Sequence, residues 1–240
     1  MDSPKTERSS LSTSLSSSKM YVLAVKLCFV MDCTASMGPW IKTARHEILN
    51  IIEYVEAKHP HADIQVAFVG YRDHGDTDRI LLHDFSDVPA LYAYLQGVVA
   101  KGGDDGAEDV ASALRQAHTL SWSKADLCLL YHIADAPAHG MLYHDEDVSD
   151  NYPEGDPFGL DPATILRQFS REGFQYTFVR ITHHTDKMVD IFENAYRRGP
   201  GRFSVIDMAG RSRHQLASQM YTALDETITQ YSASQGLAID

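Results

Sequence analysis

The sequence has few cysteines and no uninterrupted apolar run of the length that crosses a bilayer. Its three cysteines are an odd number, and Cys28 and Cys128 fall inside segments predicted to be buried strands. This pattern favours reduced core thiols in an intracellular protein over a disulfide framework. A membrane-spanning helix needs roughly 20 apolar residues, so we expect no membrane insertion. Because Lys26 interrupts the apolar run 20–31 and no small-residue cleavage site follows, we expect no secretory signal and a cytoplasmic location.

The sequence is also poor in basic residues. Lys and Arg number 21 against 33 Asp and Glu, which gives a formal net charge of −12. A protein that binds nucleic acid needs a basic face to displace the counterions of the phosphates. The arginines between 197 and 213 form only a short basic cluster. We therefore expect no nucleic-acid partner.

The chain is expected to form one domain. Its 240 residues are enough for a large core, and no internal repeat or mid-chain linker divides it. Residues 1–19 are rich in serine, with scattered charge and almost no apolar side chains, so we expect them to be disordered. Residues 20–240 are expected to be the single folded unit.

Strands and helices are predicted to alternate along this unit. Apolar, β-prone runs predict strands, and apolar residues at helical spacing predict helices. The expected strands are 22–31, 64–71, 80–85, 125–133, 174–182 and 202–207. The expected helices are 40–58, 88–98, 108–119, 162–169, 185–198 and 213–231. This alternation implies an α/β fold with a mostly parallel sheet and helices on both of its faces.

The first predicted strand ends in a carboxylate that two hydroxyls follow. Asp32 lies where the strand emerges, and Thr34 and Ser36 follow at every second position. In an extended turn both hydroxyls can face the same side, and hard oxygen ligands of this kind suit Mg²⁺ or Mn²⁺. The alternative is helix capping, in which Thr34 or Ser36 accepts hydrogen bonds from the first amides of the helix that begins near Pro39.

Two further loops bring carboxylates to the same edge of the predicted sheet. Ligands of a parallel sheet bind beyond the carboxyl ends of its strands, where Asp32, the Gly-rich loop with Asp104 and Asp105, and Asp135 all fall. Two carboxylates about 5 Å apart repel by about 3 kcal/mol at an effective dielectric of about 20. A divalent cation turns this repulsion into attraction, so the clustering favours a metal site over capping.

These residues resemble the metal-ion-dependent adhesion site of a von Willebrand factor A domain. The resemblance rests on Asp-x-Thr-x-Ser at 32–36, Gly-Gly-Asp-Asp-Gly-Ala-Glu at 102–108 and Ile-Ala-Asp-Ala-Pro at 133–137, and it extends from residue 20 to about residue 231. Segments 68–74, 132–140 and 185–188 are similar to the A domains that accompany atypical alpha-kinases, and no kinase domain is expected because the A-like unit uses up the chain.

The resemblance implies a fold and a function. The fold is a three-layer, Rossmann-like, doubly wound sheet of six strands in the order 3-2-1-4-5-6, with a short antiparallel strand 3. The function is non-enzymatic, divalent-cation-dependent binding of a protein partner. The partner would present an Asp or Glu carboxylate that completes the coordination of Mg²⁺ or Mn²⁺, since Mg²⁺ sites usually keep positions for water.

The resemblance also implies a role for each site residue. Thr34 and Ser36 would ligate the cation directly, and Asp32 and Asp135 would act through water. Asp105 would be the ligand from the second loop, because it aligns better than Asp104 with the related Gly-Gly-Gly-Asp-x-Pro-Glu pattern. The candidate partner contacts at this edge are Tyr71, Arg72, Asp104 and His139.

Two alternatives remain open at this point. One is a Mg²⁺-dependent, phosphatase-like hydrolase with Asp32 as nucleophile, although Thr34 stands where such enzymes carry their general acid. The other is a scaffold related to alpha-kinase signalling proteins, with a vestigial site. His132, His139 and His144 could form a zinc site, but no fourth ligand is evident and we expect hydrogen-bonded histidines instead.

Overall fold

The structure, a computed structural model, describes residues 21–236 and contains one six-stranded sheet. The strand order is β3-β2-β1-β4-β5-β6, and every neighbouring pair is parallel except β2 and β3. The strands are β1 (Leu23–Asp32), β2 (Ala62–Tyr71), β3 (Ile80–Ser86), β4 (Leu127–Ala134), β5 (Gln175–Arg180) and β6 (Phe203–Asp207). The predicted fold class and strand order are therefore confirmed. The predicted disordered segment 1–19 lies outside the described residues.

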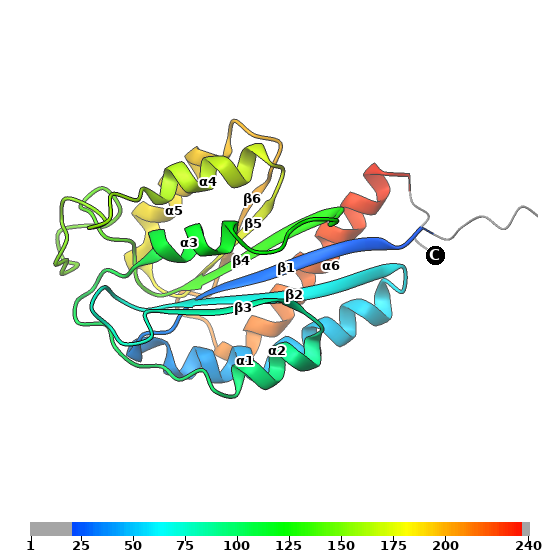
Figure 1. Cartoon of the computed structure of the whole chain (residues 1–240), viewed down its shortest axis with the longest axis horizontal. Coiled ribbons are helices and arrows are strands. Elements are labelled where there is room, and N and C mark those ends of the chain that lie inside the picture. The colour runs from blue at the N-terminus through cyan, green and yellow to red at the C-terminus, as the bar shows by residue number, and fades with distance from the viewer. Residues whose placement is uncertain (1–20, 237–240) are drawn as a thin grey trace, which may run out of the picture.

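Helices cover both faces of the sheet, which gives three layers (Figure 1). One face carries α1 (Gly38–Lys58), α2 (Val88–Leu95) and α6 (Leu216–Ser234). The other carries α3 (Val110–His118), α4 (Pro162–Arg171) and α5 (Asp186–Tyr196). Short 3₁₀ turns η1 (Ala35–Met37), η2 (His183–Thr185) and η3 (Arg213–Gln215) precede α1, α5 and α6. Within residues 21–236, no helix combines the length and the apolarity needed to span a membrane.

The central strand β1 packs against both helical layers. Leu27, Phe29 and Met31 contribute to the core under α1 and α6, whereas Cys28 and Val30 contribute to the core under α3 and α4. Burial of alternate side chains on opposite faces explains why β1 is an almost continuous apolar run. Asp32, the last residue of β1, is thereby held at a fixed position at the end of the sheet.

One boundary differs from the sequence-based prediction in a way that matters for the site. The helix expected from residue 108 begins at Val110, because the Asp109 side chain accepts a hydrogen bond from the Ser112 amide at 3.0 Å and caps it. Glu108 therefore belongs to the preceding loop, where it forms a bridge with Ala138.

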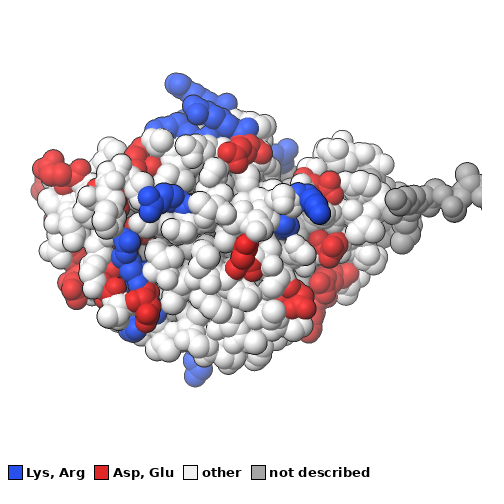
Figure 2. Space-filling model, viewed as in Figure 1, with Lys and Arg blue, Asp and Glu red and all other residues white. Residues whose placement is uncertain are grey.

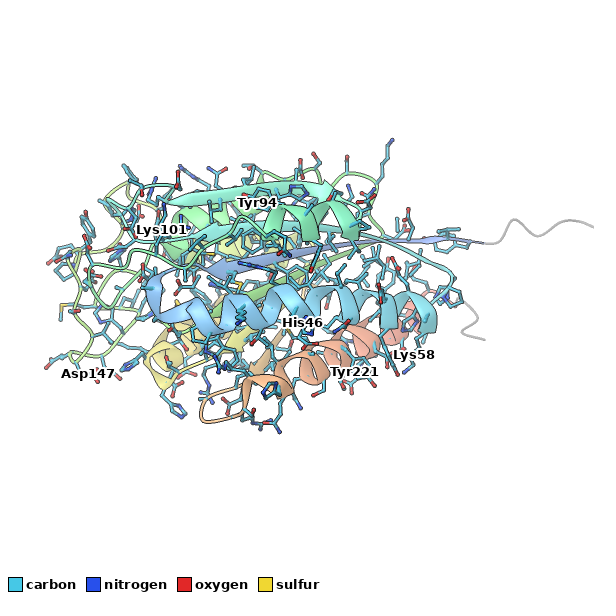
Figure 3. All side chains as sticks on the ribbon, turned by 90° about the horizontal axis from the view of Figure 1, so that it is seen from below. His46, Lys58, Tyr94, Lys101, Asp147 and Tyr221 are labelled. Atoms are coloured by element: carbon cyan, nitrogen blue, oxygen red, sulfur yellow. The ribbon has the colours of Figure 1, made fainter. Side chains whose placement is uncertain are left out.

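The loops that follow β1, β2 and β4, together with the loop between α2 and α3, gather at one end of the sheet, called here the loop end. It comprises segments 33–37, 72–79, 99–109 and 135–161. In Figure 3, Lys101 and Asp147 mark this end, and Lys58 lies near the opposite end of α1. Most of the predicted site residues end or follow a strand there, as expected for a parallel sheet, whereas Asp104 and Asp105 come from the loop between α2 and α3.

Candidate metal centre

Asp32, Thr34 and Ser36 form a compact group at the end of β1. Asp32 is fully buried, and its Oδ1 accepts hydrogen bonds from the Thr34 amide at 2.8 Å and from the Thr34 hydroxyl at 2.7 Å. The Ser36 hydroxyl lies 3.3 Å from that of Thr34. The residue before α1 is Met37, which has no capping oxygen, and Thr34 directs its hydroxyl to Asp32. The geometry thus disfavours the capping alternative.

Asp135 faces this group from the end of β4. The Thr182 hydroxyl donates to the Asp135 carbonyl, which ties the residue to the segment after β5. Burial, and next the charge of Asp135, raise the pKa of Asp32 well above its usual range. Asp32 Oδ2 and Asp135 Oδ1 are buried and have no hydrogen-bond partner among the described residues. Such unpaired oxygens are costly unless a positive charge compensates them.

The second loop closes over Thr34 through two consecutive glycines. The Ala35 amide donates to the Gly102 carbonyl at 3.2 Å, and Gly102 and Gly103 both have positive φ angles, of +83° and +85°. A Cβ at Gly103 would lie 3.0 Å from Glu108 Oε1 and 3.2 Å from Thr34 Cβ. Glycine is therefore required at 103 both for the backbone conformation and for the close approach of the two loops.

Glu108 joins the centre, and our sequence-based site did not include it. It is only 3 % exposed, and its Oε2 has no hydrogen-bond partner within residues 21–236. Burial raises its pKa, and the charges of Asp32 and Asp73 raise it further. Glu108 is the last residue of the Gly-rich motif 102–108, and this position could have pointed to a role in the site. The apolar periodicity instead placed it in the predicted helix 108–119.

The two aspartates of the second loop are placed differently. Asp104 is exposed. Asp105 is half-buried, and its carboxylate accepts hydrogen bonds from the amides of Ala107, at 3.0 Å, and Asn151. Its carboxylate also lies beside Asp73 and His139, with one oxygen within 4.8 Å of a ligand atom of each. The structure thus brings Asp105 into a neighbouring group of side chains on the same face of the loop end.

Three of the four candidate partner contacts are buried. The Tyr71 hydroxyl is 2.8 Å from His132 Nε2, and the Arg72 guanidinium donates to the carbonyls of Asp78 and Val99. His139 is only 3 % exposed. Burial does not favour direct contact of these three with a partner, because loops cover them. The contacts of Arg72 and His139 instead hold the loops together, Tyr71 contacts the core residue His132, and Asp104 alone of the four is exposed.

The predicted preference for hydrogen-bonded histidines is consistent with the contacts of His132. Its ring lies between the hydroxyls of Tyr71 and Tyr176, far inside the sheet, and burial lowers its pKa to about 3. A neutral imidazole ring can donate its N–H to one tyrosine hydroxyl and accept a hydrogen bond from the other at its second nitrogen. His132 thus belongs to the core, on a different network from His139 and His144.

The donors at the Asp32 group are all oxygens. Hydroxyls and carboxylates are the ligands that Mg²⁺ and Mn²⁺ prefer, so the residues present fit such a cation. Ser36 is exposed, and the centre is therefore open to solvent on that side. For a phosphatase nucleophile the arrangement is less suitable, since Asp32 is fully buried and the neighbouring Thr34 is no proton donor for a leaving group at ordinary pH.

Comparison with known proteins places the chain in a family. The sequence profile of the von Willebrand factor A domain matches residues 26–149, just over half of the chain. "Alpha-protein kinase vwkA" of Dictyostelium discoideum is 28% identical over 209 residues, which are 85% of this chain and 33% of that protein. The chain thus spans about a third of the length of this curated relative.

Solved structures with the same fold include a pilus adhesin and a domain of a pilus tip protein. The vWF domain of the type V pili tip protein Mfa5 from Porphyromonas gingivalis has a TM-score of 0.56 at 13% identity, over 87% of this chain and 96% of that one. The pilus adhesin SpaC from Lactobacillus rhamnosus GG has a TM-score of 0.57 at 13% identity, over 88% of this chain and 30% of that one. These likenesses show the shared fold, and the profile match over more than half of the chain shows that the chain belongs to the von Willebrand factor A domain family.

Proposed function

We propose that this chain is a non-enzymatic, divalent-cation-dependent protein-binding module that captures an acidic side chain of its partner. The single observation that carries the proposal is the pair of unpartnered, buried carboxylate oxygens, Asp32 Oδ2 and Asp135 Oδ1, beside the hydroxyls of Thr34 and Ser36. The von Willebrand factor A family consists of protein-interaction domains in general, which supports the binding role.

In this proposal Thr34 and Ser36 ligate Mg²⁺ (or Mn²⁺) directly, while Asp32 and Asp135 act through water. Asp105 retains its proposed role as the ligand from the second loop, and Glu108 is an additional carboxylate at the centre. When bound, the cation would offer a coordination position to a carboxylate from outside. Neutral hydroxyls as direct ligands keep that position electrophilic, and the exposed Ser36 side gives access to it.

The partner's carboxylate must approach an acidic rim. Figure 2 shows acidic side chains over the loop end, with basic residues between them. The formal net charge of −12 adds to the repulsion of an anionic partner. We therefore propose that the partner surrounds its carboxylate with basic residues and that high salt weakens the complex. A cytoplasmic location and a role beside alpha-kinase signalling are further parts of the proposal, supported by the kinase-named relative.

Calorimetric titration with Mg²⁺ and Mn²⁺ tests the first step. Wild-type protein should bind Mg²⁺, and Ser36→Ala should weaken this binding at least about tenfold, the equivalent of about 1.4 kcal/mol for a lost direct ligand. Ser123→Ala is the matched control, because Ser123 is also exposed but precedes β4 at the opposite end of the sheet. Equal Mg²⁺ affinity in all three proteins would refute the proposed ligands.

A peptide array tests the second step. Paired peptides that differ only by Asp against Asn, or Glu against Gln, within basic surroundings are probed with and without EDTA. We expect preferential retention on the acidic members, lost with EDTA and in Ser36→Ala. Retention that EDTA leaves unchanged would rule out capture through a cation.

A further inference from the structure

We propose that the loop end holds a second metal centre, formed by Asp73, Asp105 and His139, that takes a transition-metal cation of the Mn²⁺ or Zn²⁺ type. Each residue comes from a different loop, after β2, before α3 and after β4. One ligand atom of each lies within 4.8 Å of the others. The inference goes beyond the proposed function, because neither Asp73 nor His139 belongs to the Asp32 group; Asp105, the proposed second-loop ligand, would be shared between the two centres.

The His139 ring lies between two carboxylates, one of which could support it as a metal ligand while the other shares the cation. Its Nδ1 lies 2.7 Å from Asp150 Oδ1, and its Nε2 lies 2.7 Å from Asp73 Oδ1. Metal-binding histidines commonly donate one ring N–H to a carboxylate, which directs the lone pair of the other nitrogen at the cation. Asp150 is suited to this supporting role, because the Gly140 and Tyr152 amides fix it, each at 2.7 Å.

Glu108, which belongs to the first centre, also has an oxygen left unpartnered within residues 21–236 and adds to the negative charge in this region. Its carboxylate is buried, its Oε2 has no hydrogen-bond partner among the described residues, and Asp73 and Asp105 as well as Asp32 raise its pKa. Both groups therefore contribute negative charge at Glu108. A single dication beside Asp32 leaves the carboxylate of Asp73 without an equal compensating charge.

A neighbouring triad shows what the same residue types look like when protein cations compensate them. His74, Asp109 and Asp156 also bring their ligand atoms within 4.8 Å of one another. There the Arg79 guanidinium pairs with Asp109 and donates to His74 Nδ1 at 2.9 Å, so an arginine already balances part of the negative charge of this group. In residues 21–236, no Lys or Arg forms an ion pair with Asp73 or Asp105, and the ion-pair partner of Asp73 is His139, a member of the group itself.

The donor atoms distinguish the two centres chemically. The Asp32 group offers only oxygens, which suit Mg²⁺, whereas the second centre adds an imidazole nitrogen, which suits Mn²⁺ and Zn²⁺ better. We therefore expect Mg²⁺ to bind at the first centre alone and Mn²⁺ to bind at both. The second ion would also reduce the negative charge beside the first centre.

The test counts bound Mn²⁺ by equilibrium dialysis and detects its ligands by electron spin echo modulation. Wild type should bind two ions per chain, and His139→Gln, Asp73→Asn and Asp32→Asn should each bind one. The ¹⁴N modulation of an imidazole ligand should remain in Asp32→Asn and vanish in His139→Gln. His144→Gln is the control, because His144 also contacts Asp150, at 2.9 Å, but does not belong to the triad.

The outcomes separate the two proposals. If His139→Gln and wild type bind equal numbers of ions, or if Asp32→Asn shows no ¹⁴N modulation, the second centre is refuted whatever the first one does. If wild type binds one ion that only Asp32→Asn loses, the proposed function survives alone. If the single ion is lost only in His139→Gln, the second centre stands and the proposed ligands at Asp32 fail. Near-ultraviolet circular dichroism of each variant verifies that it is folded.

Discussion

Gly103 shows how much of the site depends on one residue without a side chain. Its φ of +85° disfavours any other residue, and a Cβ there would press on Glu108 and Thr34. The backbone strain of a non-glycine residue in this region is about 1–3 kcal/mol. In addition, displacement of Thr34 moves a proposed direct ligand, so the substitution should affect both stability and the affinity for a cation.

We predict that Gly103→Ala lowers the Mg²⁺ affinity about tenfold and the free energy of unfolding by about 1–2 kcal/mol. Gly75→Ala is a matched control, since Gly75 also has a positive φ, +91°, but nothing lies within 4 Å of an added Cβ. Gly75→Ala should lower the free energy of unfolding through the same backbone strain and leave the Mg²⁺ affinity unchanged. Titration calorimetry and urea unfolding of both variants check this. Equal loss of affinity in the two would mean that crowding at Thr34 is irrelevant.

Residue by residue, the sequence predicted positions better than it predicted exposure. Asp32 and Asp135 were predictable because an apolar run that ends in Asp places the carboxylate at a strand end. Glu108 was not, because its exclusion from α3 depends on the Asp109 cap. The burial of Arg72 was not predictable either, because the carbonyls that cover it, those of Asp78 and Val99, come from two separate segments.

Among the elements, the long loop 135–161 is the least regular and yet is well anchored. Asp150 is its central anchor, because it accepts hydrogen bonds from the Gly140 and Tyr152 amides and contacts His139 and His144. Burial acts to raise the pKa of Asp150, but these hydrogen bonds prevail and hold it at about 2. Periodicity predicts strands and helices, but it carries no information on such a loop, whose shape depends on side-chain contacts of this kind.

We predict that Asp150→Asn lowers the free energy of unfolding by about 2 kcal/mol at neutral pH, because an amide cannot accept all these hydrogen bonds. A depressed pKa in the folded state contributes stability above the ordinary carboxyl pKa, and this is lost as pH falls towards about 2. The difference between variant and wild type should therefore shrink below about pH 4. Asp147→Asn, exposed in the same loop, should have no effect. Urea unfolding across this pH range decides the point.

At the scale of the whole molecule, the fold concentrates negative charge at one end of a stable sheet. Six strands and two layers of helices hold the loops in place without help from the site. Repulsion between Asp32, Asp135 and Glu108 is therefore a cost that the cores on both faces offset. A cation bound at the loop end would relieve this cost, and its effect should be visible in the stability of the entire domain.

The pH dependence of that effect has a definite sign. Burial raises the pKa of Asp32 and of Glu108 in the folded state, so the folded protein keeps protons that the unfolded chain releases above about pH 4. Without a cation, this contribution to the free energy of unfolding therefore falls as pH rises from about 4 towards neutrality. Because Mg²⁺ takes the place of the protons, we predict a larger rise in Tm with Mg²⁺ at neutral pH than near pH 5.

Asp32→Asn, which removes one of the charges, should be more stable than metal-free wild type at neutral pH and should lose the Mg²⁺ response. Thermal unfolding of both proteins with and without Mg²⁺ measures this, and a Mg²⁺ response in wild type that is independent of pH would show that these carboxylates are not the groups that bind the ion.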